Sequence, residues 1–140
     1  MNAIDSNIWL YSQATRDPRK QGLAQQVIAS VRPLALPWQV GCEFISASRK
    51  LTVVGFTEQQ AWACLASMRV LADAVLLPIP DLWSDAHSLQ GRYSLSFWDS
   101  LLVAICLRNG VTTLYTEDMG SPRMMDGLSL VNPFLTAPIP

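Results

Sequence analysis

Apolar residues along this 140-residue chain gather in short runs that alternate with segments of helical periodicity. A short apolar run bounded by turn residues is typical of a buried strand, whereas apolar spacings of three and four residues are typical of an amphipathic helix. Strands are predicted at 2–5, 34–36, 74–77, 112–115 and 128–131. Strands that alternate with helices predict the α/β class, arranged as a three-layer α/β/α sandwich around a central parallel sheet.

Helices are predicted between the strands, and residues with known end preferences mark several boundaries. The expected ranges are a first helix after Ser6-Asn7, then 18–31, 38–49, 57–72, 80–91, and a strongly apolar helix from Ser94 or Leu95 to 109. Thr57 is followed three residues later by Gln60, which is the pattern of a capping box. Gly110 is expected to end the last helix as a left-handed cap.

The composition predicts one globular domain over residues 1–134, with residues 135–140 as a loose tail. Half of the residues are apolar and 15% are charged, which is enough apolar material for a single core. The formal charge of −1 argues against a strongly cationic nucleic-acid binder, although ten Lys and Arg could still gather on one face. No run reaches 18 apolar residues and no export signal is recognised, so we expect a cytoplasmic protein that does not enter the membrane.

Three widely spaced cysteines and a single histidine make a structural zinc site improbable. The cysteines (Cys42, Cys64, Cys106) are expected to be reduced and buried. His87 lies in a polar stretch and is expected at the surface. The five tryptophans are expected mainly in the core. A contact with nucleic-acid phosphate is left open for Arg92 and for the basic group of Arg16, Arg19 and Lys20.

Four acids stand where chemistry could use them, and each also has an ordinary structural explanation. Asp99 falls on the apolar stripe of its helix, where an unpaired carboxylate is costly, but the free amides of a helix start could also hold it. Asp5 follows a strand and could simply cap the next helix. Glu43 lies at the margin of an apolar stripe and could be a solvated flank residue. Asp118 follows a strand end, where turns favour aspartate.

Taken together, the four positions suggest a shared site. Asp5 and Asp118 follow strands whose carboxyl ends meet at one edge of a parallel sheet, and the helices of Glu43 and Asp99 could line the same crevice. Carboxylates without histidine or cysteine are hard oxygen ligands that suit Mg²⁺ or Mn²⁺. Four such groups would repel one another, so at least one pKa should be raised in the metal-free protein.

The chain resembles the PIN-domain ribonucleases, specifically the VapC-type toxins of bacterial toxin–antitoxin pairs. The resemblance extends over residues 1–134 and rests on five segments in the family's order: Ile4-Asp5-Ser6-Asn7, Gly41-Cys42-Glu43-Phe44, Leu95-Ser96-Phe97-Trp98-Asp99-Ser100, Leu114-Tyr115-Thr116-Glu117-Asp118-Met119 and Val131-Asn132-Pro133-Phe134. The Asp99 and Thr116-Glu117-Asp118 segments are specific in this combination, whereas each alone would be weak.

The resemblance implies Mg²⁺- or Mn²⁺-dependent hydrolysis of RNA phosphodiester bonds by a homodimer that a small antitoxin protein wraps and inhibits. It carries over Asp5, Glu43, Asp99 and Asp118 as catalytic acids, with Asp5, Asp99 and Asp118 as metal ligands. Supporting roles fall to Ser6, Asn7 and Thr116, while Glu117 could assist Asp118 or replace it. The RNA target, the number of metal ions and the antitoxin are not implied.

Two alternatives within the resemblance stay open, and a third class is disfavoured. The domain could be a non-catalytic PIN module that binds RNA or a protein, or a PIN nuclease that cuts DNA. A phosphotransfer enzyme with an aspartyl-phosphate intermediate would carry a second aspartate two residues after Asp5, where this chain has Asn7, or adjacent acids after its first strand, which are absent.

Overall fold

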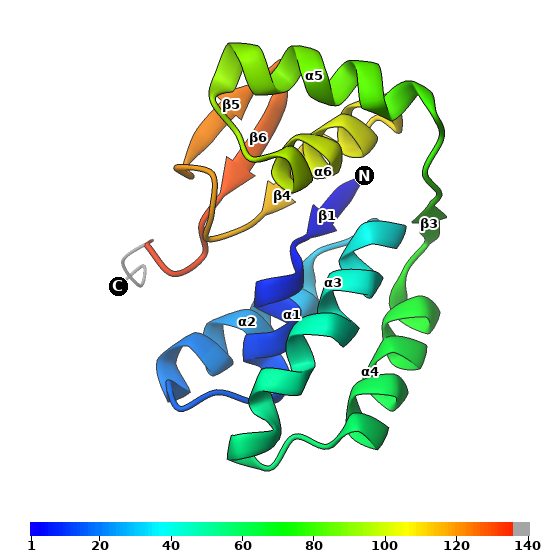
Figure 1. Ribbon diagram of the computed structural model, residues 1–140. Helices are drawn as coiled ribbons and strands as arrows, with labels where there is room; N and C mark the ends of the chain where they lie inside the picture. The colour runs from blue at the N-terminus through cyan, green and yellow to red at the C-terminus, as the bar shows by residue number, and fades with distance from the viewer. Residues whose placement is uncertain (136–140) are drawn as a thin grey trace.

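The computed structural model describes residues 1–135 as one sheet with helices on both sides (Figure 1). The strands are β1 (Asn2–Ile4), β2 (Leu34–Pro37), β3 (Ala74–Leu76), β4 (Thr113–Tyr115), β5 (Arg123–Met125) and β6 (Leu128–Val131). The helices are α1 (Ser6–Gln13), α2 (Pro18–Ser30), α3 (Trp38–Ser48), α4 (Glu58–Leu71), α5 (Asp81–Tyr93) and α6 (Phe97–Arg108), with a 3₁₀ segment η1 (Arg49–Val54) after α3. The tail expected at 135–140 lies outside the described residues, apart from Leu135.

The sheet has the order β3-β2-β1-β4-β6-β5 and is parallel except at one edge. β5 runs antiparallel to β6, and the other neighbouring pairs are parallel. The predicted α/β class with a central parallel sheet is therefore confirmed, except that the antiparallel edge strand β5 was not predicted. Its sequence signal is Asp126-Gly127, which joins β5 to β6 with φ angles of 50° and 91°. A two-residue turn with both φ angles positive is the usual connection of a β-hairpin.

The chain reverses its course across the sheet between β1 and β4. From β1 it passes through α1 and α2 to β2, then through α3 and α4 to β3. It returns through α5 and α6 to β4, on the other side of β1, and Figure 1 shows α5 and α6 apart from α1 to α4. The carboxyl ends of β1 and β4 therefore lie side by side at the switch point, where open α/β sheets bind their ligands.

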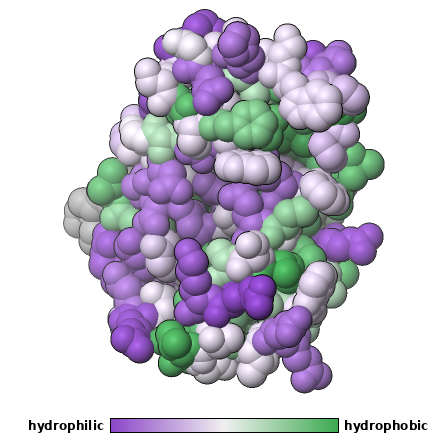
Figure 2. Space-filling model, in the orientation of Figure 1, coloured by the Kyte–Doolittle hydropathy of each residue, from purple (hydrophilic) through white to green (hydrophobic). Residues whose placement is uncertain are grey.

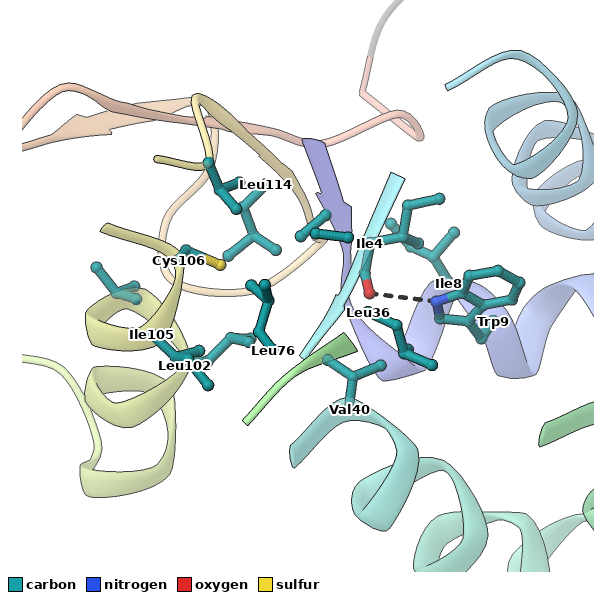
Figure 3. Packing of buried hydrophobic residues seen from close by; sticks show 14 of the residues in the cluster. Ile4, Ile8, Trp9, Leu36, Val40, Leu76, Leu102, Ile105, Cys106 and Leu114 are labelled. Carbon is teal, nitrogen blue, oxygen red and sulfur yellow. Dashed lines mark hydrogen bonds between the residues drawn. The ribbon is translucent and has the colours of Figure 1, made fainter. Parts of the chain in front are cut away.

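The core surrounds the central strands and holds the first turn of α1 in place. Ile4 and Leu114, on neighbouring strands, are both almost completely buried. Figure 3 shows Trp9 of α1 turned back toward β1, where its indole N–H donates to the carbonyl oxygen of Ile4 at 3.2 Å. This contact fixes the direction in which α1 leaves the sheet, and with it the residues at the strand-to-helix turn.

Most predicted helices have the expected ends, and α6 is the instructive exception. The Thr57 hydroxyl accepts from the amide of Gln60 at 3.1 Å, and the Gln60 side chain accepts from the amide of Thr57 at 2.9 Å, as a capping box requires. α6 begins at Phe97, later than predicted. Ser94 has a left-handed φ of 56° and ends α5, and Ser96 instead caps α6.

Two predictions about burial are wrong. Only Trp9 is buried, whereas Trp38, Trp62, Trp83 and Trp98 are each more than half exposed. The cysteines are free, but Cys42 is exposed and Cys64 is only partly buried, so Cys106 alone is a core residue. His87 is exposed, as predicted. Within residues 1–135, no helix has the length and apolar character needed to span a membrane.

Candidate active site

Asp5 is held at the strand-to-helix turn after β1, and both of its carboxylate oxygens are used. Oδ1 accepts from the amide of Ser6 at 2.7 Å, so Asp5 does cap α1, and Oδ2 accepts from the hydroxyl of Thr116 at 2.8 Å. The side chain is only 4% exposed. Capping and a role in a site are therefore compatible here, because the second oxygen faces the segment that follows β4.

The segment after β4 brings Asp118 to the same place. The Thr116 hydroxyl accepts from the amide of Asp118 at 3.0 Å while it donates to Asp5, so it links the two acids. The Asn7 side-chain amide donates to Asp118 Oδ2 at 3.0 Å. The Ser121 hydroxyl donates to the carbonyl oxygens of Thr116 and Asp118, which closes the turn. The supporting role of Ser121 was not predicted, and no sequence pattern that we used identifies it.

Glu43 and Asp99 approach from helices on opposite sides of the sheet. Gln39 joins them, because its side-chain amide donates to Glu43 Oε1 at 2.7 Å and to the carbonyl oxygen of Trp98 at 2.8 Å. Asp99 lies in the first turn of α6, half-buried, and its own amide donates to Ser96. No hydrogen bond to the Asp99 carboxylate is found within residues 1–135. Its position is therefore not explained by a capping role, which Ser96 fills.

The four acids lie close enough to influence one another's charge. The pKa of Asp5 is raised to about 6, with burial as the largest cause; the hydrogen bonds from Thr116 and Ser6 lower it, and the charges of Glu43 and Asp118 add smaller increases. Burial also raises the pKa of Glu43 and that of Asp118, and the charge of Asp99 adds to both. The expected rise is present, with burial rather than repulsion as its largest cause.

Glu117 lies beside this cluster with its own partners. Its carboxylate accepts from the Tyr11 hydroxyl at 2.6 Å and from the Lys20 ammonium at 2.9 Å. Lys20 is thus partly buried in an ion pair. The charge of Lys20 lowers the pKa of Asp118, opposing the effect of burial. Neither Tyr11 nor Lys20 was predicted to support the site.

The chemistry of the site suits a hard cation that keeps part of its water shell. Within residues 1–135, no three Asp, Glu, His or Cys side chains are close enough to enclose a metal ion by themselves. Mg²⁺ does not require this, because it is commonly bound through one or two carboxylates and several waters. Asn7 Oδ1 is buried beside Asp118 and has no hydrogen-bond partner in the described chain. An unsatisfied acceptor at this position fits a cation or its water.

An apolar groove of about 800 Å³ adjoins the acidic cluster. Glu43 is part of its lining, together with Trp38, Trp83, Trp98 and Leu101. Three of these side chains are the exposed tryptophans that the sequence pattern assigned to the core. Figure 2 shows hydrophilic side chains across the middle of one face, with paler and apolar side chains next to them. The site therefore combines a cluster of acids, of which Asp5 is buried, with an apolar surface beside it.

Comparison with known proteins finds a similar fold in several solved structures of toxins from toxin–antitoxin systems. No protein-family model and no curated protein sequence matches the chain. The structure of the VapC20 toxin from Mycobacterium tuberculosis, described as cleaving the sarcin–ricin loop, superposes with a TM-score of 0.68 at 21% identity, covering 86% of this chain and 92% of that one.

Two structures of complexes show a similar fold over nearly the full length of both chains. A toxin–antitoxin complex from Klebsiella pneumoniae has a TM-score of 0.68 at 17% identity, covering 95% and 98% of the two chains. VapBC2 from Rickettsia felis, bound to a promoter DNA fragment, has a TM-score of 0.64 at 13% identity, covering 92% and 96%. At these identities the likeness concerns the fold. The resemblance drawn from the sequence is confirmed at that level: the chain has the PIN-like α/β fold of VapC-type toxins.

Proposed function

We propose that this protein is a Mg²⁺- or Mn²⁺-dependent endoribonuclease that acts as the toxin of a toxin–antitoxin pair in the cytoplasm. The observation that carries the proposal is the convergence of Asp5, Glu43, Asp99 and Asp118 at the switch point of the sheet. Burial and mutual repulsion raise the pKa of three of them. Like charges that lie close together and are partly withdrawn from water destabilise a fold, and such clusters are characteristic of active sites.

A cation is needed for this site to accept a nucleic acid. Phosphodiesters are anionic, and four carboxylates would repel them. Asp5, Asp99 and Asp118 would hold the ion partly through its water molecules, since no three acids within residues 1–135 enclose an ion directly, with Asn7 Oδ1 as a further oxygen acceptor beside Asp118. When bound, Mg²⁺ or Mn²⁺ offsets charge on a phosphoryl oxygen and makes a water more acidic.

The residues of the chain then have separate tasks. Ser6 and Thr116 fix the two oxygens of Asp5, so this carboxylate keeps one orientation. Glu43 has a raised pKa, which makes its carboxylate a better proton acceptor at neutral pH. We assign to Glu43 the removal of a proton from the attacking water, with Gln39 holding one of its oxygens.

The substrate class and the metal requirement can be tested together. Purified protein is incubated with matched single-stranded RNA and DNA oligonucleotides in EDTA, Mg²⁺ or Mn²⁺. We expect cleavage of RNA, by analogy with the toxin VapC20, which is described as cleaving the sarcin–ricin loop. We expect this cleavage to need either metal ion, because the acids of the site are hard oxygen ligands. Cleavage of the DNA alone would favour a DNA nuclease, and binding of RNA without cleavage would favour a non-catalytic module.

The apolar groove beside Glu43 is the proposed antitoxin site. An amphipathic helix could bury its apolar face against Trp83 and Trp98, while a basic side chain, preferably arginine, reaches the carboxylates. Two of the similar structures are described as a toxin–antitoxin complex and as VapBC2 bound to promoter DNA. Co-expression with the product of an adjacent short reading frame should suppress toxicity and give a co-purifying complex. Toxicity unaffected by every adjacent small protein would contradict the pairing.

A second apolar groove, of about 620 Å³, is the proposed contact between two copies of the chain. It is lined by Trp62 and Leu65 of α4, by Val75 of β3, and by Leu77 just after this strand. β3 is an edge strand, which leaves this side of the sheet open to a partner. Arg69 in its lining disfavours a basic antitoxin segment here, so we assign this surface to the homodimer.

A further inference from the structure

Three consecutive residues after β4 are each hydrogen-bonded to the turn and helix that follow β1. Thr116 and Asp118 make the contacts with Asp5 and Asn7 described above. The residue between them, Glu117, accepts from the Tyr11 hydroxyl of α1. The segment that carries Asp118 is thus attached to α1 and its N-cap through three side chains in succession.

The spacing on α1 makes this attachment rigid. Asn7 and Tyr11 are four residues apart, so they lie one turn apart on the same face of the helix. Asn7 binds Asp118 and Tyr11 binds Glu117, which means that two adjacent residues are held by two adjacent turns. A shift of either residue would have to break its contact with the helix.

Lys20 of α2 completes the attachment and is itself confined. Its ammonium lies 2.9 Å from Glu117 Oε2, 4.7 Å from the centre of the Tyr11 ring and 5.2 Å from that of Phe134. The two rings meet edge to face, with centres 5.4 Å apart. The side chains of Lys20 and Glu117 are 28% and 21% exposed, so the ion pair is partly withdrawn from water. Both carboxylate oxygens of Glu117 are occupied.

We propose that Tyr11 and Lys20 are positioning residues, which act through Glu117 to hold Asp118 in place for the metal ion. This inference rests on the proposed function and deepens it. It also assigns Glu117: because its charge, unlike that of Asp5, is already paired with the Lys20 ammonium, it serves as the anchor of the segment and neither replaces Asp118 nor binds the metal ion. Partners that contact a metal ligand directly commonly change metal affinity by about 10- to 100-fold when they are removed, and we expect the lower end of this range for Tyr11 and Lys20, which act through Glu117.

Substitutions of these two residues allow a test, because a purely electrostatic role and a positioning role of Lys20 predict opposite changes in Mn²⁺ affinity. Removing the positive charge of Lys20 from an acidic site should strengthen Mn²⁺ binding if only electrostatics matter. If Lys20 positions Asp118, Lys20→Met should weaken Mn²⁺ binding. Tyr11→Phe removes one hydroxyl and no charge. Lys20→Arg keeps the ion pair and can still lie against the aromatic rings.

The measurement is a titration of purified full-length protein with Mn²⁺ alone, in which free Mn²⁺ is followed by electron paramagnetic resonance. We expect the dissociation constant to rise at least about tenfold in Tyr11→Phe and in Lys20→Met, and to stay within about threefold of wild type in Lys20→Arg. Lys50→Met is the control, because it removes a lysine charge from an exposed position in η1. Melting curves in EDTA check that each variant is folded.

The outcomes separate this inference from the proposed function. Unchanged or tighter Mn²⁺ binding in both Tyr11→Phe and Lys20→Met would overturn the inference, whatever the protein does to RNA. A wild type that binds no Mn²⁺ would overturn it as well. A wild type that binds Mn²⁺ but cleaves no RNA would contradict the proposed function, while weaker binding in the two variants would still support the positioning role.

Discussion

At the scale of single residues, the folded state surrounds some carboxyl groups with an environment that favours the neutral form over the charged form. Asp5 is the clearest case, because burial raises its pKa from 3.8 to about 6. A group with a raised pKa in the folded protein binds its proton more tightly there than in the unfolded chain. The contribution of Asp5 to stability is therefore most favourable below about pH 4, and it is lost as the pH rises through about 6.

This sign gives a prediction for metal-free protein. One pKa unit corresponds to about 1.4 kcal/mol, and Asp5 of the unfolded chain is already more than half ionised at pH 4, so the unfolding free energy of Asp5→Asn relative to wild type should increase by about 2 kcal/mol between pH 4 and pH 7.5. Any destabilisation by Asp5→Asn that does not depend on the ionisation of Asp5 is the same at both pH values. Urea unfolding in EDTA at the two pH values measures the difference. A difference that does not change with pH would show that Asp5 carries no such strain.

The residue identities could be predicted from the sequence, but their contacts could not. Asp5 and Asp118 could be predicted because each follows a strand with a clear apolar pattern. Asp99 could be predicted because it lies near the start of a strongly apolar helix. Tyr11 and Lys20 were missed because their partner, Glu117, is 106 and 97 positions away in sequence. Helical periodicity gives the face on which a residue lies, and only the packing of α1, α2 and the segment after β4 shows what that face meets.

At the scale of elements, the parallel strands and their helices followed from local pattern, whereas the antiparallel edge did not. β5 is three residues long and contains Arg123, so it lacks an apolar run. Its existence depends on the turn at Asp126-Gly127 and on contacts of Asp126 with Arg92 and Tyr93. The delayed start of α6 has a similar origin, because the left-handed Ser94 cannot be recognised from hydrophobic periodicity.

The hairpin turn gives a prediction with an internal control. Gly127 has a φ of +91°, which a residue with a Cβ atom rarely adopts, although the space around it is open. Gly127→Ala should therefore lower the unfolding free energy by about 1 kcal/mol or more. Gly22 lies inside α2 with equally open space, and Gly22→Ala should raise it by up to about 1 kcal/mol. Thermal unfolding of both variants checks the signs, and equal effects would contradict the strain at Gly127.

At the scale of the whole molecule, the exposed tryptophans show what hydrophobic pattern cannot distinguish. An apolar residue can be covered by the core of its own chain or by a partner protein, and the hydrophobic pattern of the sequence is the same in both cases. Trp62 and Trp83 are 53% and 69% exposed, and they line different grooves. Large exposed apolar surfaces on a small protein are characteristic of interaction sites.

The two grooves can be separated by matched substitutions of the same residue type. Trp62→Gln should convert the proposed dimer to a monomer, as measured by light scattering at several protein concentrations, and should leave antitoxin binding in place. Trp83→Gln should leave the dimer intact and weaken the antitoxin complex by about tenfold or more, since buried tryptophans often dominate interfaces. A wild type that is monomeric at all concentrations, or a Trp83→Gln variant that loses the dimer, would contradict the assignment of the grooves.

The most direct test of the acidic site uses Asp99, whose carboxylate has no hydrogen-bond partner within residues 1–135. Cleavage of a labelled RNA is measured with purified wild type, Asp99→Asn and the control Asp81→Asn, which alters an exposed acid on α5. With Mn²⁺, wild type and Asp81→Asn should cleave the RNA at similar rates. Asp99→Asn should cleave it at least about a hundredfold more slowly. The melting curve of Asp99→Asn in EDTA should show a folded protein. Full activity of Asp99→Asn, or cleavage by wild type in EDTA, would contradict a metal-dependent carboxylate site.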